Sequence, residues 1–320
     1  MNHVHPAIRE DFEAVNRLVI SRLRSDVALV ENIGHYIVEG GGKRLRPLLC
    51  LLSARALGYS GERHIELAAV IEFLHTATLL HDDVVDVSAL RRGRPTANAH
   101  WGNAPSVLVG DFIYSRAFQL LVGMGDLRLL QLIADTTNLI AEGEVEQLAR
   151  AGDPATTEAQ YLDVIRKKTA VLFAAACEGA AILAGADDAG QAAMRTFGLD
   201  LGLAFQIIDD VLDYEGDPAV MGKNVGDDLA EGKPTLPLIR AMAAGSPAQA
   251  RSVQEAIRMK DASRLAEVVA VVRDTGALAH ARQAAERHHH RALAAIAGLP
   301  ESAYLQNLRD IAALAVRRAA

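Results

Sequence analysis

Cysteine and aromatic residues are scarce in this sequence. There are two cysteines in 320 residues, Cys50 and Cys177, and aromatic side chains make up 4% of the chain. Two isolated cysteines lack the spacing of a metal-binding cluster and suit the reducing cytosol, where each is expected to be a small core residue. A metal site built on cysteine is therefore excluded, and a cytoplasmic location is expected.

An excess of positive charge and a signal peptide are missing as well. The net charge is −7, which gives no support for nucleic-acid binding. Residues 1–11 include Arg9, Glu10 and Asp11 and lack the apolar core of a signal peptide. The most apolar stretch, residues 170–186, is interrupted by Glu178 and is short for a bilayer. We expect a buried helix there, no transmembrane segment and no nucleic-acid partner.

What the sequence does contain is helix-forming apolar residues. Half of the residues are apolar, alanine and leucine dominate, and alternation with period two is nearly absent. The composition therefore predicts an all-α fold, and we expect one domain over residues 1–320. Helical periodicity predicts helices at residues 8–23, 27–38, 45–57, 65–87, 104–124, 127–149, 158–185 and 189–214, and more beyond residue 235. Residues 91–95 and 215–234 are predicted to be loops, the first basic and the second polar.

Two aspartate motifs of identical form each end a largely apolar run. They are Asp82-Asp83-Val84-Val85-Asp86 and Asp209-Asp210-Val211-Leu212-Asp213. Positions i and i+4 share a helix face, so the first and last aspartates of each motif form a pair of carboxylates. One such motif is more often a solvated acidic helix end, but two copies favour a site for Mg²⁺ held together with substrate phosphates. All six aspartates are therefore candidate metal ligands.

Basic residues gather near the two motifs. Lys43, Arg44 and Arg46 follow three glycines whose backbone can approach an anion, although the pattern is not a P-loop. His75 lies two helical turns before Asp82, on the same face, which favours a ligand role over a core histidine. The remaining candidates are Arg91, Arg92, Lys167, Lys168, Lys223 and Lys233, each of which alone could be a solvated surface charge. Together the acidic and basic sets indicate a pocket for diphosphates and metal ions.

One further motif gives no site. His288, His289 and His290 invite a metal interpretation, but consecutive residues on a helix point in different directions. A solvated helix end is the expectation for these three.

With these motifs in place, the sequence resembles the trans-polyprenyl diphosphate synthases, and most closely the bacterial long-chain, octaprenyl-type members that make the side chain of respiratory quinones. The matching segments are residues 41–47 (GGKRLRP), 71–86 (IEFLHTATLLHDDVVD), 90–98 (LRRGRPTAN), 168–169 (KT), 205–213 (FQIIDDVLD) and 221–237 (MGKNVGDDLAEGKPTLP). The resemblance implies the helical isoprenoid-synthase bundle around a deep cavity, and a homodimer. It also implies a transient membrane contact for product release.

The resemblance also implies roles for individual residues. Lys43, Arg46, His75 and Arg92 would bind isopentenyl diphosphate. Asp82, Asp86 and Asp209 would hold the Mg²⁺ ions that bind the allylic diphosphate, with further contacts from Arg91, Lys168, Lys223 and Lys233. Thr169 and Gln206 would place oxygen dipoles near the allylic cation. Mg²⁺ and the cationic side chains would stabilise the departing pyrophosphate.

Product length is the one aspect of specificity that the sequence allows us to predict. Ala77 and Thr78 lie about one turn before Asp82, at the position where a bulky aromatic residue would stop the chain early. We therefore expect a product longer than farnesyl or geranylgeranyl diphosphate, with a tunnel floor deeper in residues 113–124, where Phe118, Leu121 and Met124 are candidates. Two alternatives stay open at this point, a terpene cyclase of the same fold and a non-catalytic subunit of a heteromeric synthase.

Overall fold

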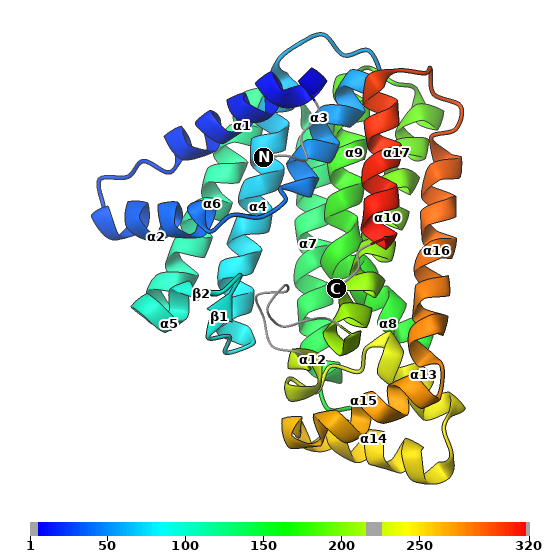
Figure 1. Cartoon of the computed structure of the whole chain (residues 1–320). Helices are drawn as coiled ribbons and strands as arrows, with labels where there is room; N and C mark the ends of the chain where they lie inside the picture. The colour runs from blue at the N-terminus through cyan, green and yellow to red at the C-terminus, as the bar shows by residue number, and fades with distance from the viewer. Residues whose placement is uncertain (1–5, 216–225, 318–320) are drawn as a thin grey trace. The chain divides into compact units, whose positions relative to one another are not determined.

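The computed structural model describes residues 6–215 and 226–317, and these residues are helical nearly throughout (Figure 1). The predicted all-α fold is confirmed. The chain divides into two compact units: unit 1 comprises residues 1–137, 172–198 and 295–310, and unit 2 comprises residues 138–171, 199–294 and 311–320. The single-domain expectation for residues 1–320 stays a prediction.

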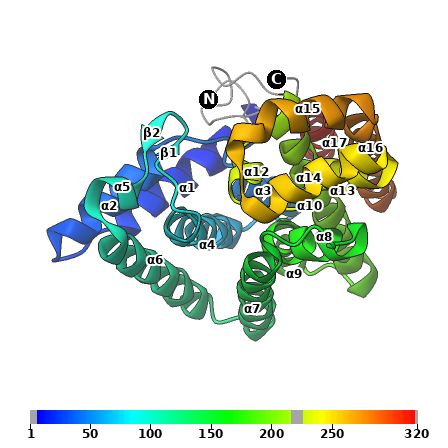
Figure 2. The same ribbon diagram turned by 90° about the horizontal axis from the view of Figure 1, so that it is seen from below.

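Unit 1 is organised around α4 (Arg63–Val85), which packs against α1 (Arg9–Arg22), α3 (Leu45–Ala56) and α6 (Asn103–Met124). In Figure 2, α4 lies between α1 and α6. The sequence explains this central place, because α4 buries side chains around most of its circumference, among them Leu67, Ile71 and Leu74. The other helices of unit 1 are η1 (Pro6–Ile8), α2 (Ala28–Glu39), α5 (Ala97–Trp101) and α9 (Val171–Leu183). The first residue of α9 belongs to unit 2.

Unit 2 contains a compact group of short helices, α13 (Leu236–Ala244), α14 (Pro247–Met259) and α15 (Leu265–Asp274), which pack against one another at the bottom of Figure 1. Leu236, Val253 and Val268 are buried in their shared core. Ser246 is the N-cap of α14 and forms a capping box with Gln249, so the sequence itself marks where this helix begins. The unit also contains α8 (Glu158–Ile165), η2 (Arg166–Ala170), α12 (Asp227–Ala230), η3 (Ala262–Arg264) and most of α16 (Ala277–Ala295).

Three helices contribute more than one residue to each unit: α7 (Leu127–Arg150), α10 (Asp188–Glu215) and α17 (Ala303–Val316). The second aspartate motif occupies the last two turns of α10, within unit 2, and the first occupies the end of α4, within unit 1.

Four local predictions need correction. The segment 158–185 is not one helix, because a π-helical turn, η2, separates α8 from α9. The basic loop is a small hairpin of β1 (Leu90–Arg91) and β2 (Arg94–Pro95), with α5 following it, and the polar loop contains α12. The three histidines lie inside α16 rather than at a solvated end: His288 is largely buried, and its Nδ1 lies 2.7 Å from Asp200 Oδ1.

The apolar stretch around Glu178 forms α9, whose apolar side chains are buried as expected, and both cysteines are buried. A different helix, α6, is the one in the described part of the chain that is long and apolar enough to cross a membrane by length and composition. One such helix is weak evidence for a membrane span. Leu108 and Val122 on α6 are more than half exposed.

Candidate active site

The first aspartate motif ends α4. Val85 is the last residue of the helix, and the backbone N–H of Asp86 donates to the carbonyl of Asp82 at 2.8 Å, so these two aspartates stand one turn apart at the helix end. Both are partly exposed. Asp83 differs, because its side chain is 1% exposed and its Oδ1 accepts hydrogen bonds from Arg91 Nε at 2.9 Å and Nη2 at 2.7 Å. Burial raises the pKa of Asp83, and Arg91 partly opposes that rise.

The hydrogen bonds from Arg91 to Asp83 connect the hairpin to α4, and two further hydrogen bonds hold the segment after the hairpin near the end of α4. Asn98 Nδ2 donates to the carbonyl of Asp83 at 3.1 Å, and Thr96 Oγ1 donates to the carbonyl of Ser88 at 2.6 Å. Arg92, in the hairpin turn, has a positive φ of 54°, which L-residues adopt at a cost. This turn brings Arg92 to the glycine loop: a Cβ on Gly42 would lie 2.6 Å from Arg92 Nη2. Glycine at position 42 leaves this space to the guanidinium, and its φ of 131° is one that other residues rarely adopt.

Cationic side chains converge in unit 1. Arg46 Nη1 lies 3.1 Å from His75 Nε2, and the Arg46 guanidinium stacks 4.4 Å above the Phe173 ring. Burial lowers the pKa of Arg46 to about 10, with Glu72 acting in the opposite direction and Arg92 in the same one. Burial, then Arg46 and Arg92, hold the pKa of His75 well below its usual value, so the imidazole is neutral at pH 7.

Glu72 is the carboxylate that this cation cluster faces, and no sequence pattern selects it. It is buried, and Arg44 Nε lies 3.8 Å from its Oε1. Burial raises its pKa, and Arg44, Arg46 and Arg92 oppose the rise. Its position one turn before His75 was the available signal. The structure thus brings together Arg46, His75 and Arg92, while Lys43 is exposed on the adjoining loop; their role in binding a substrate stays a prediction.

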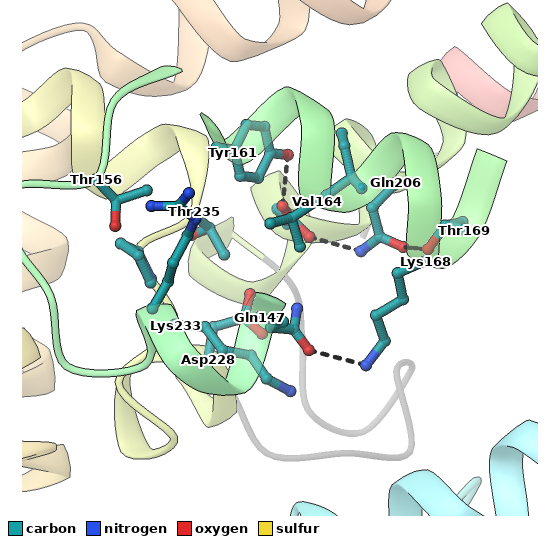
Figure 3. A pocket seen from close by; sticks show the side chains of 14 residues that line it. Gln147, Thr156, Tyr161, Val164, Lys168, Thr169, Gln206, Asp228, Lys233 and Thr235 are labelled. Carbon is teal, nitrogen blue, oxygen red and sulfur yellow. Dashed lines mark hydrogen bonds between the residues drawn. The ribbon is translucent and has the colours of Figure 1, made fainter. Parts of the chain in front are cut away.

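The second motif differs from the first, because it has one accessible and two buried carboxylates where the first has two accessible and one buried. Asp209 is partly exposed, whereas Asp210 and Asp213 are buried. Asp210 Oδ2 accepts from Tyr161 Oη at 2.6 Å, and its Oδ1 accepts from Gln206 Nε2 at 2.8 Å (Figure 3). Burial, followed by repulsion from Asp228, raises the pKa of Asp210. Asp213 Oδ2 accepts the backbone N–H of Asp228 at 3.2 Å.

Lys168 and Thr169 are presented by the π-turn η2 to the same part of unit 2. Lys168 Nζ donates to Glu144 Oε2 at 2.6 Å and to Gln147 Oε1 at 2.8 Å, and Thr169 Oγ1 donates to Gln206 Oε1 at 3.0 Å. A cavity of about 110 Å³ is lined by Gln147, Lys168, Thr169 and Gln206 together with Asp210, Asp228 and Lys233 (Figure 3). Lys233 is paired with Glu231, Lys167 binds Glu146 and Asp163 at its own side of the turn, and Lys223 lies outside the described residues.

The tyrosine, acids and amide that complete this region were not found from the sequence. Asp228 lies in the matching segment 221–237, which was the available signal for it. Tyr161, Glu144 and Gln147 lie in no such segment, and only the fold brings them to Lys168 and Asp210.

The donors suit a hard divalent cation at some of the six aspartates. Asp82, Asp86 and Asp209 offer partly exposed carboxylate oxygens, the ligands that Mg²⁺ prefers. Asp210 instead accepts hydrogen bonds from the protein at both carboxylate oxygens, and Asp83 and Asp213 each accept at one oxygen. Among residues 6–215 and 226–317, no group of three or more histidine, cysteine or acidic side chains is gathered closely enough to hold a metal unaided.

Comparison with known proteins decides the family. The profile described as "Polyprenyl synthetase" matches residues 27–275. The chain belongs to the polyprenyl synthetase family. It is accordingly a prenyltransferase, as the resemblance implied.

Curated relatives in this family cover almost the whole chain. The chain is 51% identical to the octaprenyl diphosphate synthase of Haemophilus influenzae, over 96% of this chain and 94% of that protein. It is 48% identical to the octaprenyl diphosphate synthase of Escherichia coli, over 99% of both. A polyprenyl synthase from Caulobacter crescentus, solved with calcium and isoprenyl diphosphate, superposes with a TM-score of 0.95 at 44% identity, covering 98% of this chain and 96% of that one.

Proposed function

We propose that this prenyltransferase makes an octaprenyl-type diphosphate by repeated 1′-4 condensation of isopentenyl diphosphate onto an allylic primer, farnesyl diphosphate, for a quinone side chain. The observation that supports this proposal most strongly is that the chain has one set of accessible carboxylates and one cluster of cationic side chains. One set offers accessible carboxylates at Asp82, Asp86 and Asp209, and the other is the cation cluster of Arg46, His75 and Arg92. The near-full-length similarity to two octaprenyl diphosphate synthases supports the product class.

Each group has a defined task in this proposal. Asp82, Asp86 and Asp209 would hold Mg²⁺, which when bound neutralises charge that builds on the leaving diphosphate. Arg46 and Arg92 bind the diphosphate of the condensing unit as planar forks, and neutral His75 adds a hydrogen bond without further charge repulsion.

The allylic half of the reaction uses the residues of unit 2. Lys168 and Lys233, with Arg91 from the hairpin, contact the departing diphosphate and stabilise its charge. The oxygens of Thr169 and Gln206 face the allylic cation while the double bond of isopentenyl diphosphate attacks it. We assign no side chain as the base, since the released pyrophosphate can take the proton.

We also propose a cytoplasmic homodimer. The exposed apolar residues Leu108, Val122 and Leu127 give unit 1 an apolar surface that a second copy would cover. Transient membrane contact during product release is the competing occupant of this surface. Sedimentation of the purified protein, with and without vesicles, separates the two: a stable dimer that ignores vesicles supports the proposal, and a monomer that binds them refutes it.

The product assay tests the proposed reaction. Purified protein is incubated with Mg²⁺, labelled isopentenyl diphosphate and farnesyl diphosphate, and products are resolved by chain length. Long-chain polyprenyl diphosphate supports the proposal. A cyclised hydrocarbon would indicate a terpene cyclase, which has little use for the Arg46–His75–Arg92 site. Absence of any product would favour a non-catalytic subunit, against which both complete aspartate motifs argue.

A further inference from the structure

One glycine of α7 lies directly against the turn that carries Lys168. Five residues, from Arg166 to Ala170, form a single π-turn, and the backbone N–H of Val171 closes it by donating to the carbonyl of Arg166. A Cβ placed on Gly143 would lie 2.7 Å from the backbone nitrogen of Lys168 and 2.8 Å from Lys167 Cβ. Contacts this short do not occur in proteins, and a backbone atom cannot swing away as a side chain can.

The glycine has no conformational reason to be there. Gly143 lies within α7 and has no positive φ, and glycine weakens the interior of a helix relative to alanine. Its backbone is buried. Close approach of η2 is therefore what glycine provides at this position.

Ionic contacts hold the π-turn to α7 on both sides of the glycine. Lys168 Nζ reaches Glu144 Oε2 and Gln147 Oε1, whereas Lys167 Nζ lies 2.9 Å from Glu146 Oε2. Lys167 also lies 2.7 Å from Asp163 Oδ2. The two adjacent lysines therefore reach the two flanks of one helix, as consecutive residues of a helical turn point in different directions.

From this turn a chain of hydrogen bonds leads to the second aspartate motif. Thr169 Oγ1 donates to Gln206, Gln206 Nε2 donates to Asp210, and Tyr161 Oη donates to the other oxygen of Asp210 (Figure 3). A shift of η2 would thus move Lys168 and Thr169 together, relative to Gln206 and its partner.

We propose that Gly143 is a positioning residue for catalysis: its missing side chain lets η2 approach α7, and this approach sets Lys168 and Thr169 at the allylic diphosphate. The inference rests on the proposed roles of those two residues. Adding a methyl group at position 143 pushes the π-turn outward, and misplacement of a catalytic group by about 1 Å can cost about 100-fold in rate.

The test is a double-mutant cycle on kcat with Gly143→Ala and Lys168→Ala. Gly143→Ala should lower kcat by at least about 10-fold, while KM for isopentenyl diphosphate changes by less than about 2-fold, because the residues assigned to that substrate belong to unit 1. In the Lys168→Ala background, Gly143→Ala should lower kcat by a much smaller factor, since the Lys168 side chain that it would displace is already absent. Gly298→Ala, at an exposed turn position where a Cβ meets nothing within 4 Å, is the control and should retain kcat.

Three results would overturn the inference. The first is a folded Gly143→Ala enzyme with unchanged kcat, and the second is an equal loss in both backgrounds. The third is wild-type kcat in both Lys168→Ala and Thr169→Val, which removes their proposed roles and the inference with them. Loss of kcat in these two variants without loss in Gly143→Ala refutes the inference alone and leaves the proposed function standing.

A variant without added bulk covers the case in which Gly143→Ala does not fold. Lys167→Met removes the contacts to Glu146 and Asp163 and leaves glycine at position 143, where η2 approaches α7. It should lower kcat by about 3-fold, again less in the Lys168→Ala background. Unchanged kcat in Lys167→Met, alongside an unfolded Gly143→Ala, would count against the inference.

Discussion

Asp83 and Asp210 are the second aspartates of their motifs, and each is held by a donor from another element. Arg91 of the hairpin binds Asp83, and Tyr161 of α8 binds Asp210. A buried carboxylate that keeps such donors is stabilised in place, whereas loss of the donor would leave it unsatisfied. At the residue scale, the second position of each motif therefore fixes surrounding structure, whereas the first position, Asp82 or Asp209, is accessible, as is Asp86.

Arg92 provides a prediction that separates the two substrates. Arg92→Ala should raise KM for isopentenyl diphosphate more than KM for the allylic primer, because Arg92 lies with Arg46 and His75. Steady-state kinetics with each substrate varied in turn measures this. Arg94→Ala is the control, since that guanidinium stacks 4.3 Å above the Tyr36 ring and has no assigned substrate. A larger effect on the primer would mean that the roles of Arg91 and Arg92 are reversed.

At the scale of elements, long amphipathic helices are predicted from the sequence, and short or irregular elements are not. The predicted helix of residues 127–149 differs from α7 by a single residue at its end, because glycine and charge mark its ends. The π-turn η2 was missed because Arg166, Lys167 and Lys168 are compatible with an ordinary helix, and only packing against Gly143 distinguishes the two. The hairpin was missed because strands of two residues are too short to show an alternating pattern. Contacts outside the strands, from Arg91 and Asn98 to Asp83, accompany the hairpin.

A buried histidine between α1, α3 and α4 makes stability depend on pH. Asp11 of α1 accepts from Arg55 Nε at 2.8 Å, and His64 Nε2 lies 2.9 Å from the same carboxylate. Burial lowers the pKa of His64, with Asp11 opposing that change only in part. Burial would raise the pKa of Asp11, but hydrogen bonds from Arg55 and His64 outweigh it, so this pKa is lowered.

The sign of the effect is the same for both groups. The unfolded chain binds more protons than the folded one, so stability falls as the pH drops below about 6.5, the ordinary pKa of histidine. His64→Gln should weaken the fall of Tm between about pH 6.5 and pH 5, whereas His290→Gln, at an exposed histidine of α16, should not. An unchanged slope of Tm against pH in His64→Gln would contradict this role.

Helix α4 also contains the length-control prediction. Ala77 is fully buried, and Thr78 Oγ1 donates to the carbonyl of His75 at 2.8 Å. Ala77→Tyr should shorten the main product to the farnesyl–geranylgeranyl range by blocking a tunnel about 7.5 Å below Asp82. Overpacking costs about 1–3 kcal/mol, so Tm is measured beside the products. An unchanged long product from the folded variant would show that the chain does not pass this face.

At the scale of the whole molecule, composition was sufficient to predict the all-α class, and the two motifs together with the other matching segments were sufficient to predict the family. The resemblance rested on segments spread over residues 41–237, and the family profile spans residues 27–275. The environments of Glu72, Tyr161 and Glu144 were beyond sequence reasoning, because each acts through a partner more than one helical turn away in the chain. The joint use of the two aspartate motifs stays a prediction.

The turnover of two aspartate variants tests the central claim most directly. Asp82→Ala or Asp209→Ala should lower kcat with Mg²⁺ and both diphosphates by at least about 100-fold, or about 2.7 kcal/mol of barrier, because each removes an accessible metal ligand. The exposed Asp135 of α7 supplies the control, and Asp135→Ala should keep wild-type kcat. Near-wild-type kcat in either folded variant, Asp82→Ala or Asp209→Ala, would contradict the assignment of the metal site.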